Sequence, residues 1–207
     1  MYDVSLISRA IISDLGKVVL WFDNSIFYRK MTAYCLKSIE EIREIVHENP
    51  EFYELFDLGR ITPKEFYARA VARLGARIGY NDFMAAYVDV FRLNRPVLEL
   101  LQRLKPKYRL VLVSNCDAVR FESIRKKFPE IGIFDGRVLS YELGVMKPDP
   151  GIYQEALRLA QADPSACVFI DDMAENIAGA AALGIRGILY QPDTDLACEL
   201  AALGVSP

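Results

Sequence analysis

The sequence has no concentration of positive charge, no long hydrophobic run and only one histidine. Its formal net charge is −3, and Lys and Arg are spread along the chain, which argues against nucleic acid or another polyanion as partner. No apolar stretch is long enough to span a bilayer, and the first residues lack the pattern of a signal peptide. We therefore expect no membrane partner and a cytoplasmic location. His47 lies in a glutamate-rich stretch and is expected to be a solvated surface residue, so triad chemistry is not expected.

Cysteine is also scarce. The four cysteines lie far apart in the sequence and form no CxxC pair. In a chain of this size, such spacing favours neither a disulfide framework nor a structural zinc site. We expect all four to be reduced and buried: Cys35, Cys116, Cys167 and Cys198.

From residue 95 onward, short apolar runs alternate with helical patterns. Runs at 110–113, 167–170 and 187–190 are each followed by a predicted helix, the first two near 117–127 and 174–183. Strands that read as continuous apolar runs and alternate with helices are typical of a parallel sheet covered on both faces. Residues 10–12 form another such run near the N-terminus. The pattern predicts an α/β fold with a doubly wound parallel sheet.

Residues 24–93 have a different texture, with no strand-like runs and many aromatic residues at helical spacing. Thr62-Pro63 followed by Glu65 predicts a helix start with a capping box, and Asp149-Pro150 predicts another helix start. We therefore predict a helical cap at 24–93, inserted into an α/β core domain made of 1–23 and 94–207. The aromatic residues are expected to form the core of the insert rather than a binding pocket.

Polar residues follow the predicted strands where each strand ends. In an open parallel sheet, ligands bind beyond the carboxyl ends of the strands, near the switch point of strand order. An adjacent pair of carboxylates beside a buried strand repels unless a cation lies with it. The residues expected at this edge are Asp14, Ser114, Asn115, Lys147, Asp171 and Asp172.

These segments resemble the four motifs of the haloacid dehalogenase (HAD) superfamily. They are Ile-Ser-Asp14-Leu-Gly16, Val-Ser114-Asn, Gly-Val-Met-Lys147-Pro-Asp-Pro and Phe-Ile-Asp171-Asp172-Met-Ala-Glu-Asn176, in that order. The resemblance is to a helical-cap (C1) phosphatase-type member with a D-L-G first motif, and it covers nearly the whole chain. It implies a HAD-like hydrolase that acts on a small phosphorylated metabolite, a sugar phosphate being one candidate.

The same resemblance implies a role for each site residue. Asp14 would attack phosphorus and form an aspartyl-phosphate. Mg²⁺ would be held by Asp14, Asp172 and the Gly16 carbonyl, with Asp171 ligating it or holding a bound water. Ser114 and Asn115 would bind the substrate, and Lys147 would offset the charge of both nucleophile and phosphate. Asn176 would steady the acidic loop or be only structural.

Gly16 departs from the usual pattern, because most phosphatases of the superfamily have a second Asp there as general acid and base. A glycine keeps the carbonyl ligand but loses the proton transfer. General acid–base assistance is worth about 10² to 10⁴ in rate, whereas phosphatase accelerations approach about 10²¹, so the loss would slow the reaction without abolishing it. Aryl phosphates should then be favoured over alkyl ones, unless another group, such as Arg60 or Tyr28, supplies the proton.

Two alternatives remain open. A dehalogenase uses the same nucleophilic Asp without a metal, and it tolerates Gly16 but leaves the Asp171-Asp172 pair without a role. A degenerate site in a phosphate-binding or regulatory protein is the other, suggested by Gly16, Lys17 and Ser13. No feature of the sequence indicates an oligomeric state.

Overall fold

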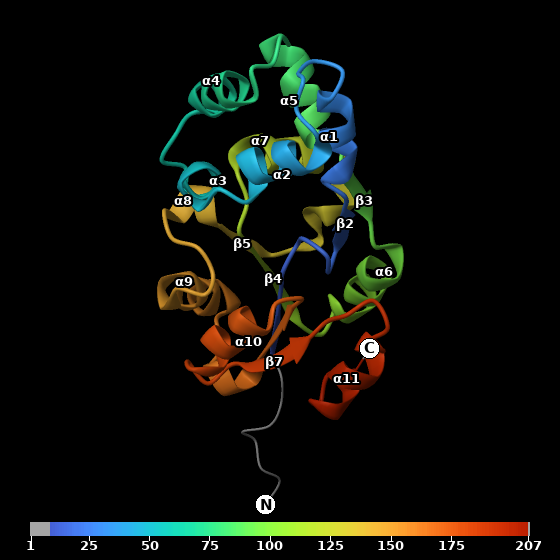
Figure 1. Ribbon diagram of the computed structural model, residues 1–207. Coiled ribbons are helices and arrows are strands. Elements are labelled where there is room, and N and C mark those ends of the chain that lie inside the picture. Colours follow the sequence, from blue (N-terminus) through green and yellow to red (C-terminus); the bar gives the residue numbers. More distant parts are fainter. Residues whose placement is uncertain (1–8, 207) are drawn as a thin grey trace, which may run out of the picture.

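A computed structural model describes residues 9–206, and their core is a five-stranded parallel sheet (Figure 1). In spatial order the strands are β5 (Gly136–Leu139), β4 (Arg109–Ser114), β1 (Ala10–Ser13), β6 (Cys167–Asp171) and β7 (Arg186–Leu189). The chain crosses from β1 to β4 and β5 on one side, then to β6 and β7 on the other. The doubly wound parallel sheet is therefore confirmed, with the switch of strand order at β1.

Helices cover both faces of the sheet. Alternate strand residues point to opposite faces. Ile12, Val113 and Phe169 pack towards α9 (Pro150–Ala160) and α10 (Ala174–Ala181). Ile11, Leu112 and Ile170 belong to the other core, with residues of α6 (Arg95–Leu104), α7 (Ala118–Lys127) and α11 (Leu196–Ala202). Figure 1 shows α9 and α10 on one side of the sheet and α6 and α11 on the other. Each fully buried side chain of this size contributes about 1.5–3 kcal/mol, so the sheet is a rigid base for its edges.

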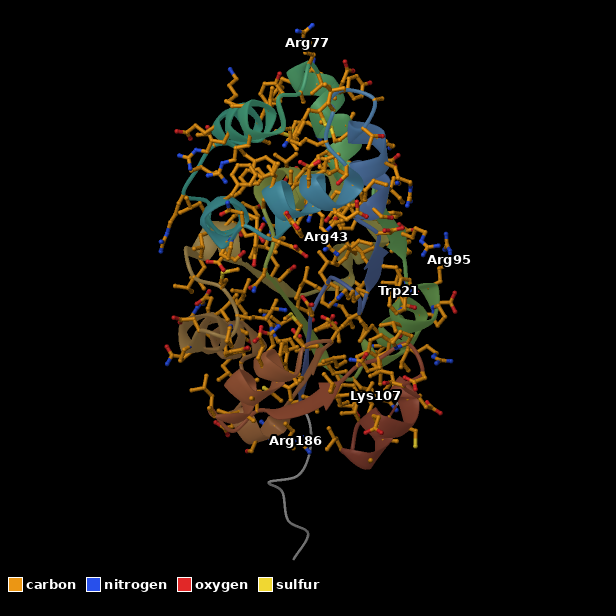
Figure 2. All side chains as sticks on the ribbon, viewed as in Figure 1. Trp21, Arg43, Arg77, Arg95, Lys107 and Arg186 are labelled. Carbon is orange, nitrogen blue, oxygen red and sulfur yellow. The ribbon has the colours of Figure 1, made fainter. Side chains whose placement is uncertain are left out.

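A helical insert lies between two short strands, β2 (Leu20–Phe22) and β3 (Phe91–Leu93), which pair antiparallel. Its helices are α1 (Ser25–Met31), α2 (Ile39–His47), α3 (Pro50–Asp57), α4 (Pro63–Leu74) and α5 (Tyr80–Val88). Trp21 lies at the base of the insert and Arg77 at its far end (Figure 2). The expectation of no strand within 24–93 is wrong for β3. A segment of three residues is too short to show the alternation typical of a strand, and β3 is a strand only because it pairs with β2.

The insert is held together by aromatic rings. Phe66 stacks between Phe52 and Phe56, with ring centroids 4.8 Å and 4.3 Å apart, and Phe83 and Tyr87 complete the cluster. The expectation that the aromatic residues form the insert core is therefore confirmed for most of them, but it is wrong for Tyr34, which is exposed, and for Phe91, which lines a pocket. The predicted capping box of α4 is also confirmed, because Thr62 and Glu65 bond reciprocally.

Two other expectations are corrected in part. The cysteines are all free, but Cys198 is exposed on α11 and Cys35 only half-buried, so just Cys116 and Cys167 are buried. β5 was not predicted, because Gly136-Arg137-Val138-Leu139 offers only two apolar residues. Among the described helices, none has the length and apolar character needed to cross a membrane.

Candidate active site

The carboxyl ends of β1, β4 and β6 bring the predicted site residues together. Ser13 lies opposite Leu112 of β4 and Ile170 of β6, and the Asp14 N–H donates to the Ile170 carbonyl at 2.8 Å. This register sets Asp14 level with Asp171, the last residue of β6, and Asp172 follows directly. Ser114, the last residue of β4, is 3% exposed and lines the same pocket as Asp14.

Lys147 lies between two buried carboxylates. Its Nζ is 2.7 Å from Asp14 Oδ1 and 2.6 Å from Asp171 Oδ2, and the lysine is 5% exposed. At such distances inside a protein, one cation offsets part of the charge of both partners. Burial dominates and raises the pKa of Asp14 to about 7, with Asp171 adding to the rise and Lys147 opposing it.

Asn115 holds Lys147 in place. The Lys147 N–H donates to Asn115 Oδ1 at 2.8 Å, and Asn115 Nδ2 donates to the Lys147 carbonyl at 3.0 Å. Both ends of the amide are therefore engaged with the lysine backbone, although Asn115 also lines the pocket. Its predicted contact with substrate stays a prediction, whereas its contact with the lysine was not foreseen.

Asp171 is fixed by the loop that follows it. Its Oδ1 accepts from the Met173 N–H and from Asn176 Nδ2, both at 2.9 Å, and it is fully buried. The Tyr153 hydroxyl in turn donates to the Asn176 carbonyl at 2.8 Å. Asn176 therefore steadies the acidic loop, the first of the two roles expected for it.

The three carboxylates form a cluster suited to a hard cation. Oxygens of Asp14, Asp171 and Asp172 lie within 4.8 Å of one another. Asp172 pairs with Lys17 at 3.3 Å, and that lysine is half exposed. Gly16 lines the same pocket as Asp14 and Asp172. The bridge between Gly16 and Leu20 uses the N–H of Lys17 and the carbonyl of Leu15, not the Gly16 carbonyl. Carboxylate and carbonyl oxygens are the ligands that Mg²⁺ prefers, so the donor set fits this ion.

The space beside Gly16 is occupied by an aromatic ring. A Cβ at this position would lie 3.1 Å from Cε1 of Phe22. A side chain there would force the ring to move. The missing acid is thus matched by a ring that lies in tight contact with the place where its side chain would begin.

A pocket of about 170 Å³ opens over these residues. Sequence reasoning missed two of its charged lining residues, Asp57 at the end of α3 and Arg120 of α7. Neither lies in a recognisable motif, so no local signal identifies them. The lining comprises Asp14, Leu15, Gly16, Lys17, Leu20, Phe22, Asp57, Phe91, Ser114, Asn115, Cys116, Arg120, Ile124, Lys147, Asp172, Met173 and Asn176.

His47 is not the solvated residue that was expected. Its Nε2 lies 2.8 Å from Arg120 Nη2, and its ring packs against Phe27, Tyr28 and Tyr87. Burial, and secondarily Arg120, hold its pKa well below the usual value. The face of α2 that bears His47 points into the protein. The glutamates on the opposite face are exposed, and their presence around His47 in the sequence led to the wrong expectation.

Comparisons with known proteins agree with this geometry. Sesquiterpene phosphatase astK of Aspergillus oryzae is 29% identical over 172 residues, covering 80% of this chain and 85% of that protein. D-ribitol-5-phosphate phosphatase of Bacteroides thetaiotaomicron is 24% identical over 194 residues, 89% of this chain and 92% of that protein. Drimenol cyclase drtB of Aspergillus calidoustus is 26% identical over 96% of this chain, which spans only 37% of that protein's length.

A solved structure and a family model complete the comparison. The HAD family enzyme bt-2542 of Bacteroides thetaiotaomicron, in complex with magnesium and inorganic phosphate, superimposes with a TM-score of 0.76 at 25% identity. That match covers 93% of this chain and 98% of the other. A model described as haloacid dehalogenase-like hydrolase matches residues 7–184. Together with the sheet order and the lysine-bridged carboxylates, this match shows that the chain belongs to the haloacid dehalogenase-like hydrolase family.

Proposed function

We propose that this protein is a Mg²⁺-dependent phosphatase of small phosphorylated metabolites, with Asp14 as nucleophile. The observation that carries the proposal is Lys147, buried between Asp14 and Asp171 at one end of a pocket that Ser114 and Asp172 also line. The phosphatases among the relatives, and the magnesium and phosphate bound by bt-2542, support it.

The reaction takes two displacements at phosphorus. An Asp14 carboxylate oxygen attacks the phosphorus, the bond from phosphorus to the leaving oxygen breaks, and an aspartyl-phosphate forms. Water then attacks that phosphorus and releases phosphate with the Asp14 carboxylate restored. Lys147 neutralises charge on the nucleophile and the phosphoryl oxygens, and Ser114 donates a hydrogen bond to them.

The metal ion would be held by Asp14, Asp172 and the Gly16 carbonyl. Asp171 would either bind it directly or hold one of its bound waters. When bound, Mg²⁺ supplies further positive charge against the phosphoryl oxygens. A dehalogenase would use Asp14 without a metal and would give the adjacent Asp171 and Asp172 no metal to hold, so the cluster of all three favours the phosphatase. In this proposal residues 24–93 form the cap domain, and residues 1–23 and 94–207 form the core domain. Closure of the cap excludes water while the phosphoryl group is transferred.

Removing magnesium is expected to stop phosphate release from 4-nitrophenyl phosphate. A chelator should lower the rate at least about 100-fold, and added Mg²⁺ should restore it. Asp172→Asn should raise the Mg²⁺ concentration needed for half-maximal rate, whereas Asp193→Asn, at an exposed site beyond β7, should not. Magnesium-dependent phosphate binding without turnover would indicate the degenerate site instead. Halide release from a 2-haloacid without magnesium would indicate the dehalogenase.

The organic part of the substrate is apolar in this proposal rather than a polyhydroxylated sugar. Besides the polar residues, the pocket is lined by Leu20, Phe22, Phe91, Ile124 and Met173. For ethyl, butyl and hexyl phosphate, kcat/KM should rise about fourfold per methylene that enters the pocket, since each contributes about 0.8 kcal/mol. Steady-state rates compared with those of a hexose phosphate provide the measurement. Preference for the hexose phosphate, with no effect of chain length, would favour the sugar-phosphate alternative.

A further inference from the structure

The site as described has no group to protonate the leaving oxygen. Gly16 has no side chain, and the Phe22 ring lies 3.1 Å from where one would start. Lys147 is engaged by Asp14 and Asp171, and Lys17 is paired with Asp172. Burial and nearby carboxylates hold the pKa of the Cys116 thiol well above its ordinary value. Of the two donors considered from sequence, neither Arg60 nor Tyr28 is among the lining residues, and Arg60 lines a separate pocket.

Asp57 reaches this pocket from the insert. It is the last residue of α3, is half-buried, and lines the same pocket as Asp14 and Ser114. Cys116 lines the pocket with Asp57 and Asp14, and negative charge on either carboxylate raises the pKa of its thiol. Asp57 is therefore a carboxylate that the insert contributes to the pocket containing Asp14.

The end of α3 is fastened to the core at this point. Ser140 Oγ donates to the Asp57 carbonyl at 2.6 Å and accepts from the Cys116 N–H at 2.9 Å, in the loop that begins at Ser114. Gly59, with φ of +66°, passes so close to the Tyr141 carbonyl that a Cβ would overlap it. α3 consequently lies against α8 (Ser140–Leu143), as Figure 1 shows. The position of the Asp57 backbone is thus set by the core as well as by the insert.

The surroundings of Asp57 keep it near the midpoint of its titration. Burial, and then the nearby Asp117, raise the pKa of Asp57 to about 7, with Glu54 adding to the rise and Arg120 opposing it. Tyr87 donates to Asp117 at 2.9 Å, so that carboxylate is held in place. A carboxyl group that populates both forms near neutral pH can give a proton and take one back.

We infer that Asp57, supplied by the insert, is the general acid and base that Gly16 lacks, an assignment that rests on the proposed phosphatase function. In the first step Asp14 attacks phosphorus, the bond to the leaving oxygen breaks, and the Asp57 proton passes to that oxygen as the alcohol forms. In the second step the Asp57 carboxylate takes a proton from the water that attacks the aspartyl-phosphate. Phosphate leaves, and Asp14 and protonated Asp57 are restored.

The test is how the rate depends on the leaving group in Asp57→Asn. With hexyl phosphate, whose alkoxide needs a proton, kcat/KM should fall about 10² to 10⁴-fold. With 4-nitrophenyl phosphate, which leaves without one, it should stay within about tenfold of the parent protein. Asp82→Asn, which removes an exposed carboxylate of the same insert, should leave both rates unchanged, and Asp57→Glu should recover part of the alkyl activity.

The pH profile gives a second readout. Because Asp57 acts protonated, the parent kcat/KM for hexyl phosphate should fall as pH rises above about 7, and Asp57→Asn should lack this alkaline limb. Asp14 acts ionised and contributes only to the acid limb. The titratable and charged groups that interact with Asp57, and so affect its pH profile, are Asp117, Arg120, Glu54, Cys116, Tyr53 and Tyr87.

Equal losses with both substrates, or none with either, would overturn the assignment of Asp57. The assignment would also be overturned if the parent protein cleaved the aryl phosphate but no alkyl phosphate, although the proposed phosphatase function would then be retained. Absence of magnesium-dependent turnover with every substrate would instead remove the proposed function itself. Circular dichroism and a thermal midpoint for each variant distinguish lost chemistry from lost folding.

Discussion

Asp14→Asn is expected to abolish phosphate release, lowering the rate by roughly 10⁴ to 10⁶-fold, as loss of a covalent nucleophile does. The amide has the same shape but cannot attack phosphorus at a useful rate. Lys147 keeps Asp171 as a partner at 2.6 Å, so no buried charge is left without a counterion. The fold should therefore persist, and the loss should be confined to chemistry.

Phosphate release from 4-nitrophenyl phosphate, followed at saturating magnesium, is the measurement for Asp14→Asn. Asp23→Asn removes an exposed carboxylate just beyond β2 and should keep full activity. Acid quench of the parent enzyme with labelled substrate should trap phosphate on the protein, and Asp14→Asn should trap none. Activity of the variant within tenfold of the parent would mean that Asp14 is not the nucleophile.

Lys147→Met is expected to lose both activity and stability. Removing one partner of a buried ion pair costs about 3–5 kcal/mol, because a charge is left buried without compensation. Here two carboxylates, Asp14 and Asp171, lose their shared cation. Turnover should fall at least about 100-fold, since the charge facing the phosphoryl oxygens is lost as well.

The stability of Lys147→Met should depend on pH with a definite sign. Burial already raises the pKa of Asp14 to about 7, and without Lys147 nothing opposes that rise from this side, so the folded variant binds more protons than the unfolded state. The variant should therefore lose stability as pH rises above about 4, the ordinary pKa of an aspartate, and its deficit should narrow as pH falls towards that value.

Urea unfolding at several pH values measures this deficit. Lys107→Met, at the exposed position labelled in Figure 2, is the control and should change stability by less than about 0.5 kcal/mol. Magnesium should recover part of the deficit if it binds beside the same carboxylates. A variant as stable as the parent at neutral pH would mean that Lys147 does not compensate the buried charge of Asp14 and Asp171.

Much of the core domain was predictable because its signals are local. Apolar runs followed by helical patterns predicted β1, β4, β6 and β7, and the capping residues around Thr62 predicted the start of α4. The short strands β2 and β3 gave no such signal. Each has only three residues, and their strand conformation depends on pairing across the whole insert.

The sequence by itself determined the family and the set of polar residues at the strand ends, because parallel strands must bring their carboxyl ends to one edge. Only the tertiary structure decided what surrounds them. The Phe22 ring lies beside Gly16, and Asn115 binds the backbone of Lys147. Asp57 reaches the pocket from the insert. No local sequence pattern predicts any of these contacts. Hydrophobic period and helix capping act over a few residues, whereas these contacts arise only when the chain folds back on itself, within the core for Asn115 and Lys147 and between insert and core for Asp57.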